Sequence, residues 1–176
     1  YQGYATEEEI LSMYENKTAR YSIEGPLHLG ALLAGENEAL RELYSEYAIP
    51  LGIAYQIQDD IIGIFGDEEA IGKPVGSDIQ EGKYTLLVAK AMEKGTREQV
   101  ARLKVLLSGQ KLITKNEVEE FQNILQETGA LETVRAMAKE ATEKSLAVLP
   151  RLKTLMTEEA FDFLEKLTKY LLERDI

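Results

Sequence analysis

The sequence predicts an all-α fold, a helical bundle formed by a single domain over residues 1–176. Apolar residues recur at spacings of three and four through most of the chain, as on the buried face of a helix. No stretch shows the strict alternation of apolar and polar residues, bounded by turn residues, that a half-buried strand requires. A chain of 176 residues is also long enough to bury a core of its own.

Three helices are expected to begin at capping boxes. In such a box, a threonine and a Glu or Gln three residues later each bind a free backbone N–H group of the other. The boxes are Thr6–Glu9, Thr96–Gln99 and Thr114–Glu117. Each of them predicts a helix start.

The last third of the chain predicts two amphipathic helices. The side chains at helical spacing are Val118, Phe121 and Leu125 in the first, and Phe161, Leu164, Thr168 and Leu171 in the second. These faces should pack on the bundle and serve as scaffold.

A long apolar stretch in the first half of the chain predicts a helix from about Asn37 to Phe65, in which Pro50 marks a kink or a break. The segment from Gly66 to Gly82 is punctuated by glycines, so it predicts a loop with at most one short helical turn. Helix is expected to resume near residue 83 or 84 and to run to about residue 94.

Charge and composition exclude several classes of function. The 31 acidic and 20 basic side chains give a formal net charge of −11, so the chain as a whole repels nucleic acid and anionic membranes. No apolar run reaches the ~18 residues that a membrane span needs, so no stable membrane insertion is expected. The absence of cysteine excludes disulfides, thiol nucleophiles and cysteine-bound metals, and a cytoplasmic location is the simplest interpretation.

Three features of the N-terminal part carry weaker expectations. The single histidine, His28, stands among apolar residues and is expected to be a packed helix residue. The small residues of the run 30–35 are expected to let helices pack closely. Because the chain begins at Tyr1 and not at methionine, a preceding N-terminal portion is expected.

An acidic pair, Asp59–Asp60, stands on the otherwise apolar helix, where adjacent carboxylates need a partner. Magnesium takes oxygen ligands and prefers one or two protein carboxylates together with substrate phosphates, so the pair is a candidate magnesium site. At a spacing of four residues, Tyr55 shares a helix face with Asp59, and Gln56 shares one with Asp60. The alternative is that both aspartates are solvated or form ion pairs.

Three further charged residues, Lys73, Asp78 and Lys83, lie in the glycine-rich loop that follows. Glycine lets the backbone approach a ligand closely and lysine offers a compact positive charge, so this loop is a candidate diphosphate clamp. An ordinary surface loop with solvated lysines is the alternative. Upstream, Lys17 supplies another cation, which taken by itself is an exposed helix lysine.

Together these motifs resemble the trans-prenyl diphosphate synthases, most of all the short-chain farnesyl and geranylgeranyl diphosphate synthases. The motifs are Lys17-Thr18, the aromatic-Gln pair Tyr55-Gln56, the pair Asp59-Asp60 and the loop Gly72-Lys73…Asp78…Gly82-Lys83. The resemblance extends from about Thr6 to Leu87. It implies a helical bundle of the isoprenoid synthase type, and an enzyme that joins an allylic prenyl diphosphate to isopentenyl diphosphate and releases diphosphate.

The resemblance also implies which residues neutralise charge. Asp59 is the implied Mg²⁺ ligand, and Asp60 supports it directly or through water. Lys17, Lys73 and Lys83 are the cations implied to hold the allylic diphosphate. Metal ions and lysines suit this reaction because negative charge grows on the leaving diphosphate.

Four further residues have implied roles at the reaction site. The Thr18 hydroxyl and the Gln56 oxygen are implied to stabilise the carbocation and to orient the departing proton. The ring of Tyr55 is implied to stabilise positive charge and to bind the homoallylic substrate. Asp78 is implied to hold Lys73 or metal-bound water.

The sequence departs from the family pattern at two places. Gly63 stands where the family commonly has a third aspartate, and the family's first aspartate-rich motif is absent from the chain. The chain therefore resembles the C-terminal part of such an enzyme, with the missing N-terminal half and a second copy in a homodimer as implied partners. Two alternatives stay open: a non-catalytic subunit that pairs with an active partner, and a helical diphosphate-binding module unrelated to prenyl transfer.

Overall fold

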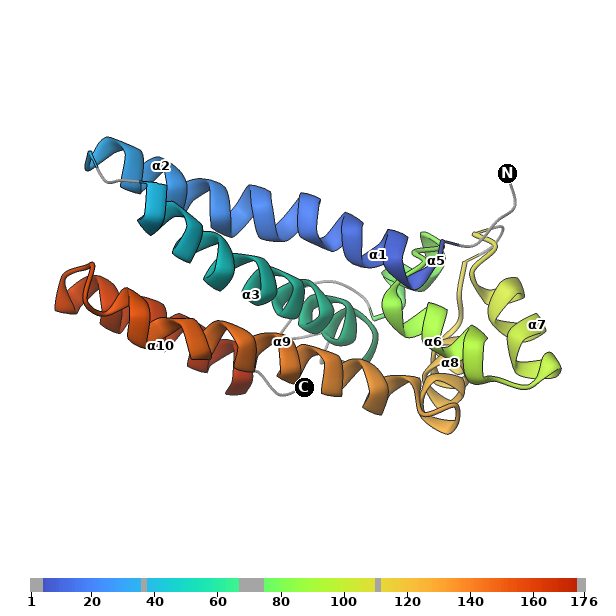
Figure 1. Cartoon of the computed structure of the whole chain (residues 1–176). Coiled ribbons are helices and arrows are strands. Elements are labelled where there is room, and N and C mark those ends of the chain that lie inside the picture. The colour runs from blue at the N-terminus through green and yellow to red at the C-terminus, as the bar shows by residue number, and fades with distance from the viewer. Residues whose placement is uncertain (1–4, 36–37, 67–74, 110–111, 174–176) are drawn as a thin grey trace. The chain divides into compact units, whose positions relative to one another are not determined.

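The computed structural model describes residues 5–35, 38–66, 75–109 and 112–173, and of 171–173 the backbone alone. In this part of the chain every secondary-structure element is a helix, which confirms the predicted all-α class. The helices, coloured along the chain in Figure 1, are α1 (Glu7–Tyr14), η1 (Glu15–Glu24), α2 (Gly25–Leu33), α3 (Glu38–Phe65), α5 (Ser77–Gln80), α6 (Leu86–Lys94), α7 (Arg97–Leu106), α8 (Lys115–Glu127), α9 (Ala130–Leu152) and α10 (Glu158–Glu173).

The helices fall into two compact units. Among the described residues, one unit comprises those up to Ile10 and those within Asp59–Ala136, and the other comprises those within Leu11–Gln58 and from Met137 onward. The chain thus enters the second unit, leaves it and returns to it. The expectation of a single domain stays a prediction.

All three capping boxes open a helix, as predicted. The Thr96 hydroxyl accepts a hydrogen bond from the Gln99 N–H at 3.2 Å, and the Gln99 side chain accepts one from the Thr96 N–H at 2.9 Å. Thr6 and Thr114 make the same reciprocal bonds at the starts of α1 and α8. These boxes satisfy backbone N–H groups that the first turn of a helix leaves free.

The long apolar stretch forms one helix, α3, which continues through Pro50 without a break. The short turn α5 is the single helical turn predicted for the described end of the loop 66–82; residues 67–74 lie outside the described part. Helix α6 ends at Lys94 as predicted but begins at Leu86, later than expected. The reason is that Thr85 takes an extended conformation, with φ −89° and ψ 172°, and precedes the first helical residue.

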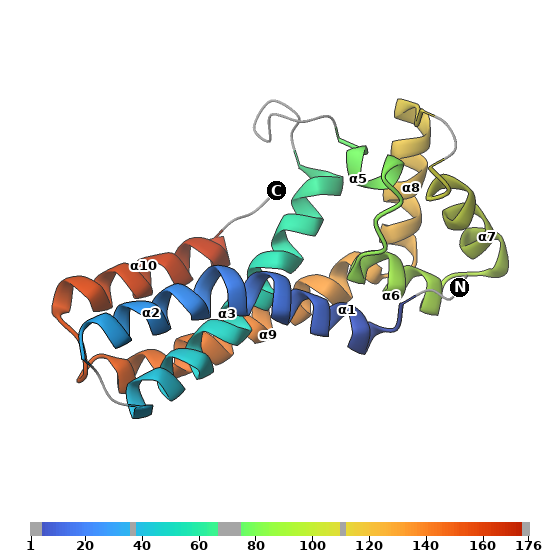
Figure 2. The same cartoon turned by 90° about the horizontal axis from the view of Figure 1, so that it is seen from above.

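The unit formed by Leu11–Gln58 and Met137–Asp175 is a bundle of helices that run side by side (Figures 1 and 2). Short connections make α2 antiparallel to α3, and α9 antiparallel to α10. Its buried core draws on α2, α3, α9 and α10, and consists of Ala31, Leu40, Tyr47, Ala48, Leu51, Val148, Leu149, Leu152 and Leu164. Burial of each such leucine contributes about 1.5–3 kcal/mol. The predicted apolar face of α10 is confirmed for its described side chains; Leu171 lies outside them.

A buried hydrogen-bond network ties α3 to α9 and α10 inside this core. The Tyr47 hydroxyl lies 2.9 Å from Oγ1 of Thr168 and donates to the Leu164 carbonyl at 3.1 Å. The Ser145 hydroxyl donates to the Tyr47 carbonyl at 2.9 Å. Tyr47, Ser145 and Thr168 are all 0% exposed, so these bonds satisfy groups that would each cost about 1–3 kcal/mol if left unpaired. Burial raises the pKa of Tyr47 to about 12.

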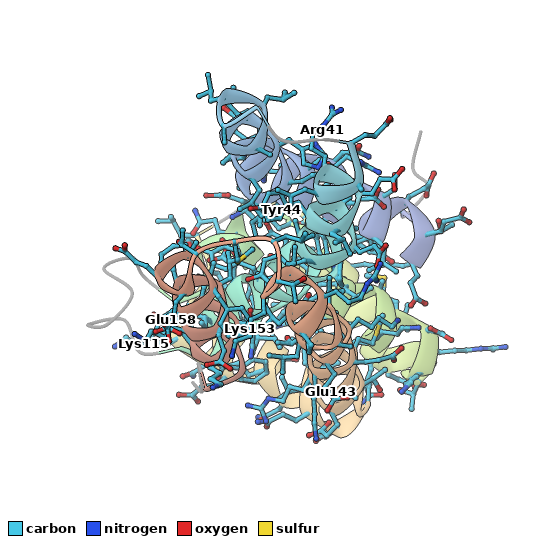
Figure 3. All side chains as sticks on the ribbon, turned by 60° about the vertical axis from the view of Figure 1, so that its left-hand side comes forward. Arg41, Tyr44, Lys115, Glu143, Lys153 and Glu158 are labelled. Atoms are coloured by element: carbon cyan, nitrogen blue, oxygen red, sulfur yellow. The ribbon has the colours of Figure 1, made fainter. Side chains whose placement is uncertain are left out.

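The outer face of this bundle is charged. Glu143 projects away from α9 (Figure 3), with Lys139 Nζ 3.9 Å from its carboxylate. After the end of α9, Lys153 Nζ lies 4.9 Å from the centroid of the Phe161 ring on α10, a cation–π contact. These surface contacts are weak, so the buried network and the apolar core hold the bundle together.

Helix α2 confirms one expectation and corrects another. His28 is a half-buried helix residue whose Nε2 lies 2.8 Å from the Arg41 carbonyl and 3.0 Å from the Ser45 hydroxyl. Ala31 is buried, but Gly30 is exposed and nothing lies within 4 Å of the Cβ it would carry as alanine. The prediction that small residues bring helices together is therefore wrong at Gly30.

In the other unit, α6, α7 and α8 contact one another. The predicted apolar face of α8 is confirmed, since Val118, Phe121 and Leu125 are all buried. Gln122 on α8 donates to the Ile64 carbonyl at 2.6 Å, one of the carbonyls that the end of α3 leaves free. None of the described helices is both long and apolar enough to cross a membrane.

Replacing Tyr47 with phenylalanine should change how stability depends on alkaline pH. At neutral pH the variant should lose about 1 kcal/mol of unfolding free energy, because a buried hydroxyl and its bonds are removed. Between pH 10 and 12 the parent chain should lose up to about 1.4 kcal/mol per pH unit, because its unfolded state ionises this tyrosine at the ordinary pKa while the folded state does not. Urea unfolding at a series of pH values measures both effects.

Tyr170→Phe is the matched control, because Tyr170 is 60% exposed on α10. It should leave stability and its alkaline slope unchanged. Equal alkaline slopes for the parent and Tyr47→Phe would contradict the burial argument.

Candidate functional site

The segment that carries Lys17 and Thr18 is a π-helix, in which each N–H bonds five residues back instead of four. It ends where the Gly25 N–H donates to the Arg20 carbonyl. Arg20 pairs with Glu15, five residues away, at 2.5 Å, a spacing at which side chains of an α-helix do not meet. The sequence predicted a helix here but not its type. Such π-helical segments are frequent at functional sites.

The structure brings two of the predicted site residues together. The Thr18 hydroxyl in η1 donates to Oε1 of Gln56 in α3 at 2.6 Å, and Thr18 is only 6% exposed. The neighbours of this pair, Lys17 and Tyr55, are both exposed. Each helix therefore holds one polar residue inward and presents the preceding residue in sequence to solvent.

A glycine permits this contact. Gly52, one turn before Gln56 on α3, faces Ala19, the residue after Thr18. A Cβ on Gly52 would lie 2.3 Å from the Ala19 Cα, which is a backbone atom that cannot move aside alone. The absence of a side chain thus sets how closely η1 and α3 approach, and the Thr18–Gln56 hydrogen bond forms beside that point.

The acidic pair follows on α3, one turn beyond Tyr55 and Gln56. Asp59 is exposed like Tyr55, whereas Asp60 is 7% exposed, on the more buried side with Gln56. The face sharing predicted from the spacing of four is thus observed. A carboxylate as buried as Asp60 is stable in its charged form only with hydrogen bonds or a cation beside it.

Asp78 in α5 pairs with Lys83, which follows that helix. Lys83 Nζ lies 2.6 Å from Oδ1 of Asp78 and 3.3 Å from Oε2 of Glu81, and the Lys83 N–H donates to the Asp78 carbonyl at 3.0 Å. Asp78 is 5% exposed, while the side chain of Lys83 remains 45% exposed. The hydrogen bond to Asp78 is the main cause that raises the pKa of Lys83 above its ordinary value. Lys83 is therefore a fixed positive charge with access to solvent.

The predicted site residues thus appear in separate groups. Thr18 and Gln56 form one pair and Asp78 and Lys83 another, while Lys73 lies outside the described residues. The implied contact of Asp78 with Lys73 is therefore not among the described ones.

Sequence reasoning missed the role of two helical glycines, Gly52 and Gly63. A signal existed, since glycine inside a helix costs roughly 0.5–1 kcal/mol relative to alanine and usually marks a close approach.

The donor set of the acidic pair fits magnesium. The two carboxylates are adjacent, and Asp59 is open to solvent. Magnesium is bound in many enzymes by one or two carboxylates, with phosphate oxygens of the substrate and water completing its shell. Among the described residues, no group of three or more His, Cys, Asp or Glu side chains could hold a metal ion.

Fold and side chains together define a class of protein: a helical protein with an acidic pair on a long, largely apolar helix, one turn after a glutamine that bonds a buried threonine. Comparison with known proteins gives the family. A family model described as polyprenyl synthetase matches residues 2–126. The chain belongs to the polyprenyl synthetase family, and the resemblance drawn from its motifs is confirmed.

Two relatives are archaeal. The short chain isoprenyl diphosphate synthase of Methanocaldococcus jannaschii is 41% identical over 69% of this chain and 37% of its own length. That of Methanothermobacter thermautotrophicus is 34% identical over 97% of this chain and 50% of its own length. The chain thus spans half or less of the length of these relatives. That it corresponds to their C-terminal half stays a prediction.

A solved structure agrees with both the fold and the extent of the match. It is a geranylgeranyl pyrophosphate synthase from Corynebacterium glutamicum, complexed with isoprenyl diphosphate and magnesium. It is 34% identical, with a TM-score of 0.88 over 96% of this chain and 47% of that chain. The expected isoprenoid synthase type of helical fold is confirmed.

Replacing Gly52 with alanine should separate η1 from α3. The new Cβ would meet the Ala19 backbone, so we expect a loss of about 1–3 kcal/mol of unfolding free energy and loss of the Thr18–Gln56 hydrogen bond. Urea unfolding and the NMR shift of the Gln56 side-chain amide measure the two effects. Gly30→Ala, a helical glycine with open space around it, is the control and should be neutral or stabilising. Equal stability of the two variants would refute the close approach.

Proposed function

We propose that this chain is part of a prenyltransferase that condenses an allylic prenyl diphosphate with isopentenyl diphosphate and releases diphosphate. Membership of the polyprenyl synthetase family supports the reaction class. The relatives named as short chain isoprenyl diphosphate synthases support a short-chain product. Because the chain spans about half the length of its relatives, we propose that it works together with a second, N-terminal half.

The observation that carries the proposal is the order of polar side chains on α3. Gln56 bonds Thr18, and the acidic pair Asp59–Asp60 follows one turn later on a helix that is otherwise largely apolar. A purely structural helix gains nothing from burying the Asp60 carboxylate and from holding a half-buried amide against the buried hydroxyl of Thr18 on η1. A helix that lines a site for an ionising substrate needs these groups.

In the proposed reaction the bond between the allylic carbon and the diphosphate oxygen breaks, and the electron pair leaves with the diphosphate. The double bond of isopentenyl diphosphate then attacks the allylic carbon, and a proton passes from the resulting cation to the released diphosphate, which forms the new double bond. Negative charge grows on the leaving group and positive charge on the carbon skeleton, so the enzyme must stabilise both.

On the diphosphate side, Lys83 is a fixed cation supported by Asp78, with Lys17 and Lys73 as the other proposed diphosphate-binding lysines. Asp59 would hold Mg²⁺, and Asp60 would support it directly or through water. When bound, the ion supplies Lewis acid stabilisation of the departing oxygens. The structure of the Corynebacterium relative with isoprenyl diphosphate and magnesium supports this choice of cofactor.

On the carbon side, Thr18 and Gln56 offer oxygens held by their mutual hydrogen bond, which can stabilise the carbocation and orient the departing proton. The exposed ring of Tyr55 can stabilise positive charge through its π face. Because Thr18 is almost completely buried, this pair loses little conformational entropy when substrate binds.

Asp59→Asn in the complete synthase should lower turnover by about 10²- to 10³-fold with the fold intact, since it removes a ligand for charge that develops in the transition state. Steady-state kinetics at saturating Mg²⁺ measures the effect. Asp162→Asn, at an exposed aspartate of α10, is the matched control and should leave turnover unchanged. A loss smaller than tenfold for Asp59→Asn would refute the metal role.

The chain by itself should not catalyse prenyl transfer, because it carries one acidic pair and lacks the family's first aspartate-rich motif. Each 1.4 kcal/mol of missing transition-state stabilisation costs about tenfold in rate. Incorporation of radiolabelled isopentenyl diphosphate, measured before and after addition of a separately expressed N-terminal half, tests this. Activity of the chain alone would contradict the claim of an incomplete site. Inactivity on mixing would favour the non-catalytic subunit or the diphosphate-binding module.

A further inference from the structure

Gly63 lies buried inside α3, where a glycine weakens the helix relative to alanine. A Cβ at this position would lie 2.6 Å from Oδ2 and 3.4 Å from Cγ of Asp78. The Asp78 carboxylate therefore occupies the space that any side chain on residue 63 would need. The bare backbone of α3 is the surface against which this carboxylate packs.

The other oxygen of the same carboxylate holds a lysine. Oδ1 of Asp78 lies 2.6 Å from Lys83 Nζ, and the backbone closes the same short segment through the bond from the Lys83 N–H to the Asp78 carbonyl. Gly82, with φ +66°, supplies the left-handed residue that this turn requires. Contact with α3 on one side and with Lys83 on the other thus fixes the carboxylate.

We propose that Gly63 is a positioning residue, whose missing side chain lets Asp78 dock on α3 and thereby fixes the ammonium group of Lys83. The position of Lys83 then depends on a residue that it does not touch and that precedes it by twenty positions. Only the further step, that Lys83 binds diphosphate, rests on the proposed function.

A side chain on residue 63 would displace the docked carboxylate. Asp78 is 5% exposed and has a short side chain, so a methyl group on residue 63 forces either the carboxylate or α5 to move. We expect either movement to lengthen the 2.6 Å contact with Lys83. Glu81, whose carboxylate is 61% exposed and 3.3 Å from the same ammonium, would remain as the weaker partner.

The test measures the pKa of Lys83 by NMR, together with thermal unfolding, in Gly63→Ala, Asp78→Ala, the double variant and Gly30→Ala. Gly63→Ala should lower the pKa of Lys83 to the value found in Asp78→Ala, because both changes remove the carboxylate from the ammonium. It should also lower the melting temperature, whereas Gly30→Ala, which adds the same methyl group in open space, should not.

The double variant separates positioning from a general packing defect. With Asp78 reduced to alanine the clash disappears, so adding Gly63→Ala to Asp78→Ala should cost no stability and should leave the pKa of Lys83 unchanged. A pKa of Lys83 in Gly63→Ala equal to that of the parent chain would overturn the proposal. So would equal losses of melting temperature from Gly63→Ala in the presence and absence of the Asp78 carboxylate.

Calorimetric titration with inorganic diphosphate and Mg²⁺ then separates the positioning of Lys83 by Gly63 from the proposed binding of diphosphate by Lys83. Weaker affinity in Gly63→Ala and Asp78→Ala, with Gly30→Ala unchanged, supports both the positioning and the diphosphate role of Lys83. If the pKa of Lys83 shifts as expected but the affinity does not change, the positioning role stands and the proposed diphosphate role of Lys83 fails.

Discussion

Helix α3 must stay largely apolar to pack in the core and yet carry polar groups at fixed points along its length. Two of these points are set by glycines. Gly52 admits η1 close enough for Gln56 to bond Thr18, and Gly63 admits the Asp78 carboxylate. Glycine lowers the intrinsic stability of a helix. The two glycines therefore weaken α3 by itself, and the close contacts that they permit stabilise it through tertiary packing.

Much of the fold could be predicted from the sequence because the relevant signals are local. The capping boxes at Thr6, Thr96 and Thr114 depend on residues three positions apart, and all three open a helix. The start of α6 was misplaced because its N-cap, Thr85, has Val88 three residues later in place of the Glu or Gln of a capping box. The π-helical form of η1 was not predicted either, because no residue type in the sequence marks a helix with hydrogen bonds between residues five positions apart.

The candidate site could be predicted only in part, because its residue types are visible in sequence and its pairings are not. The Thr18–Gln56 bond spans 38 residues, and nothing in composition links its two ends. Burial also divides adjacent residues, since Asp60 is 7% exposed beside the exposed Asp59. A motif states which groups are present, whereas the helix face and the neighbouring glycine decide what each group contacts.

The Tyr47 network has a consequence for the order in which the chain folds. Its bonds join residues that are 98, 117 and 121 positions apart, and the chain between α3 and α9 belongs mainly to the other unit. The core around Tyr47 is thus completed only after α10 has left the ribosome. Loop closure costs only about 0.6 kcal/mol more per doubling of length, but long-range contacts form slowly. Until α9 and α10 have been synthesised, the apolar side of α3 is exposed to solvent. Such a surface promotes aggregation and is a binding site for chaperones.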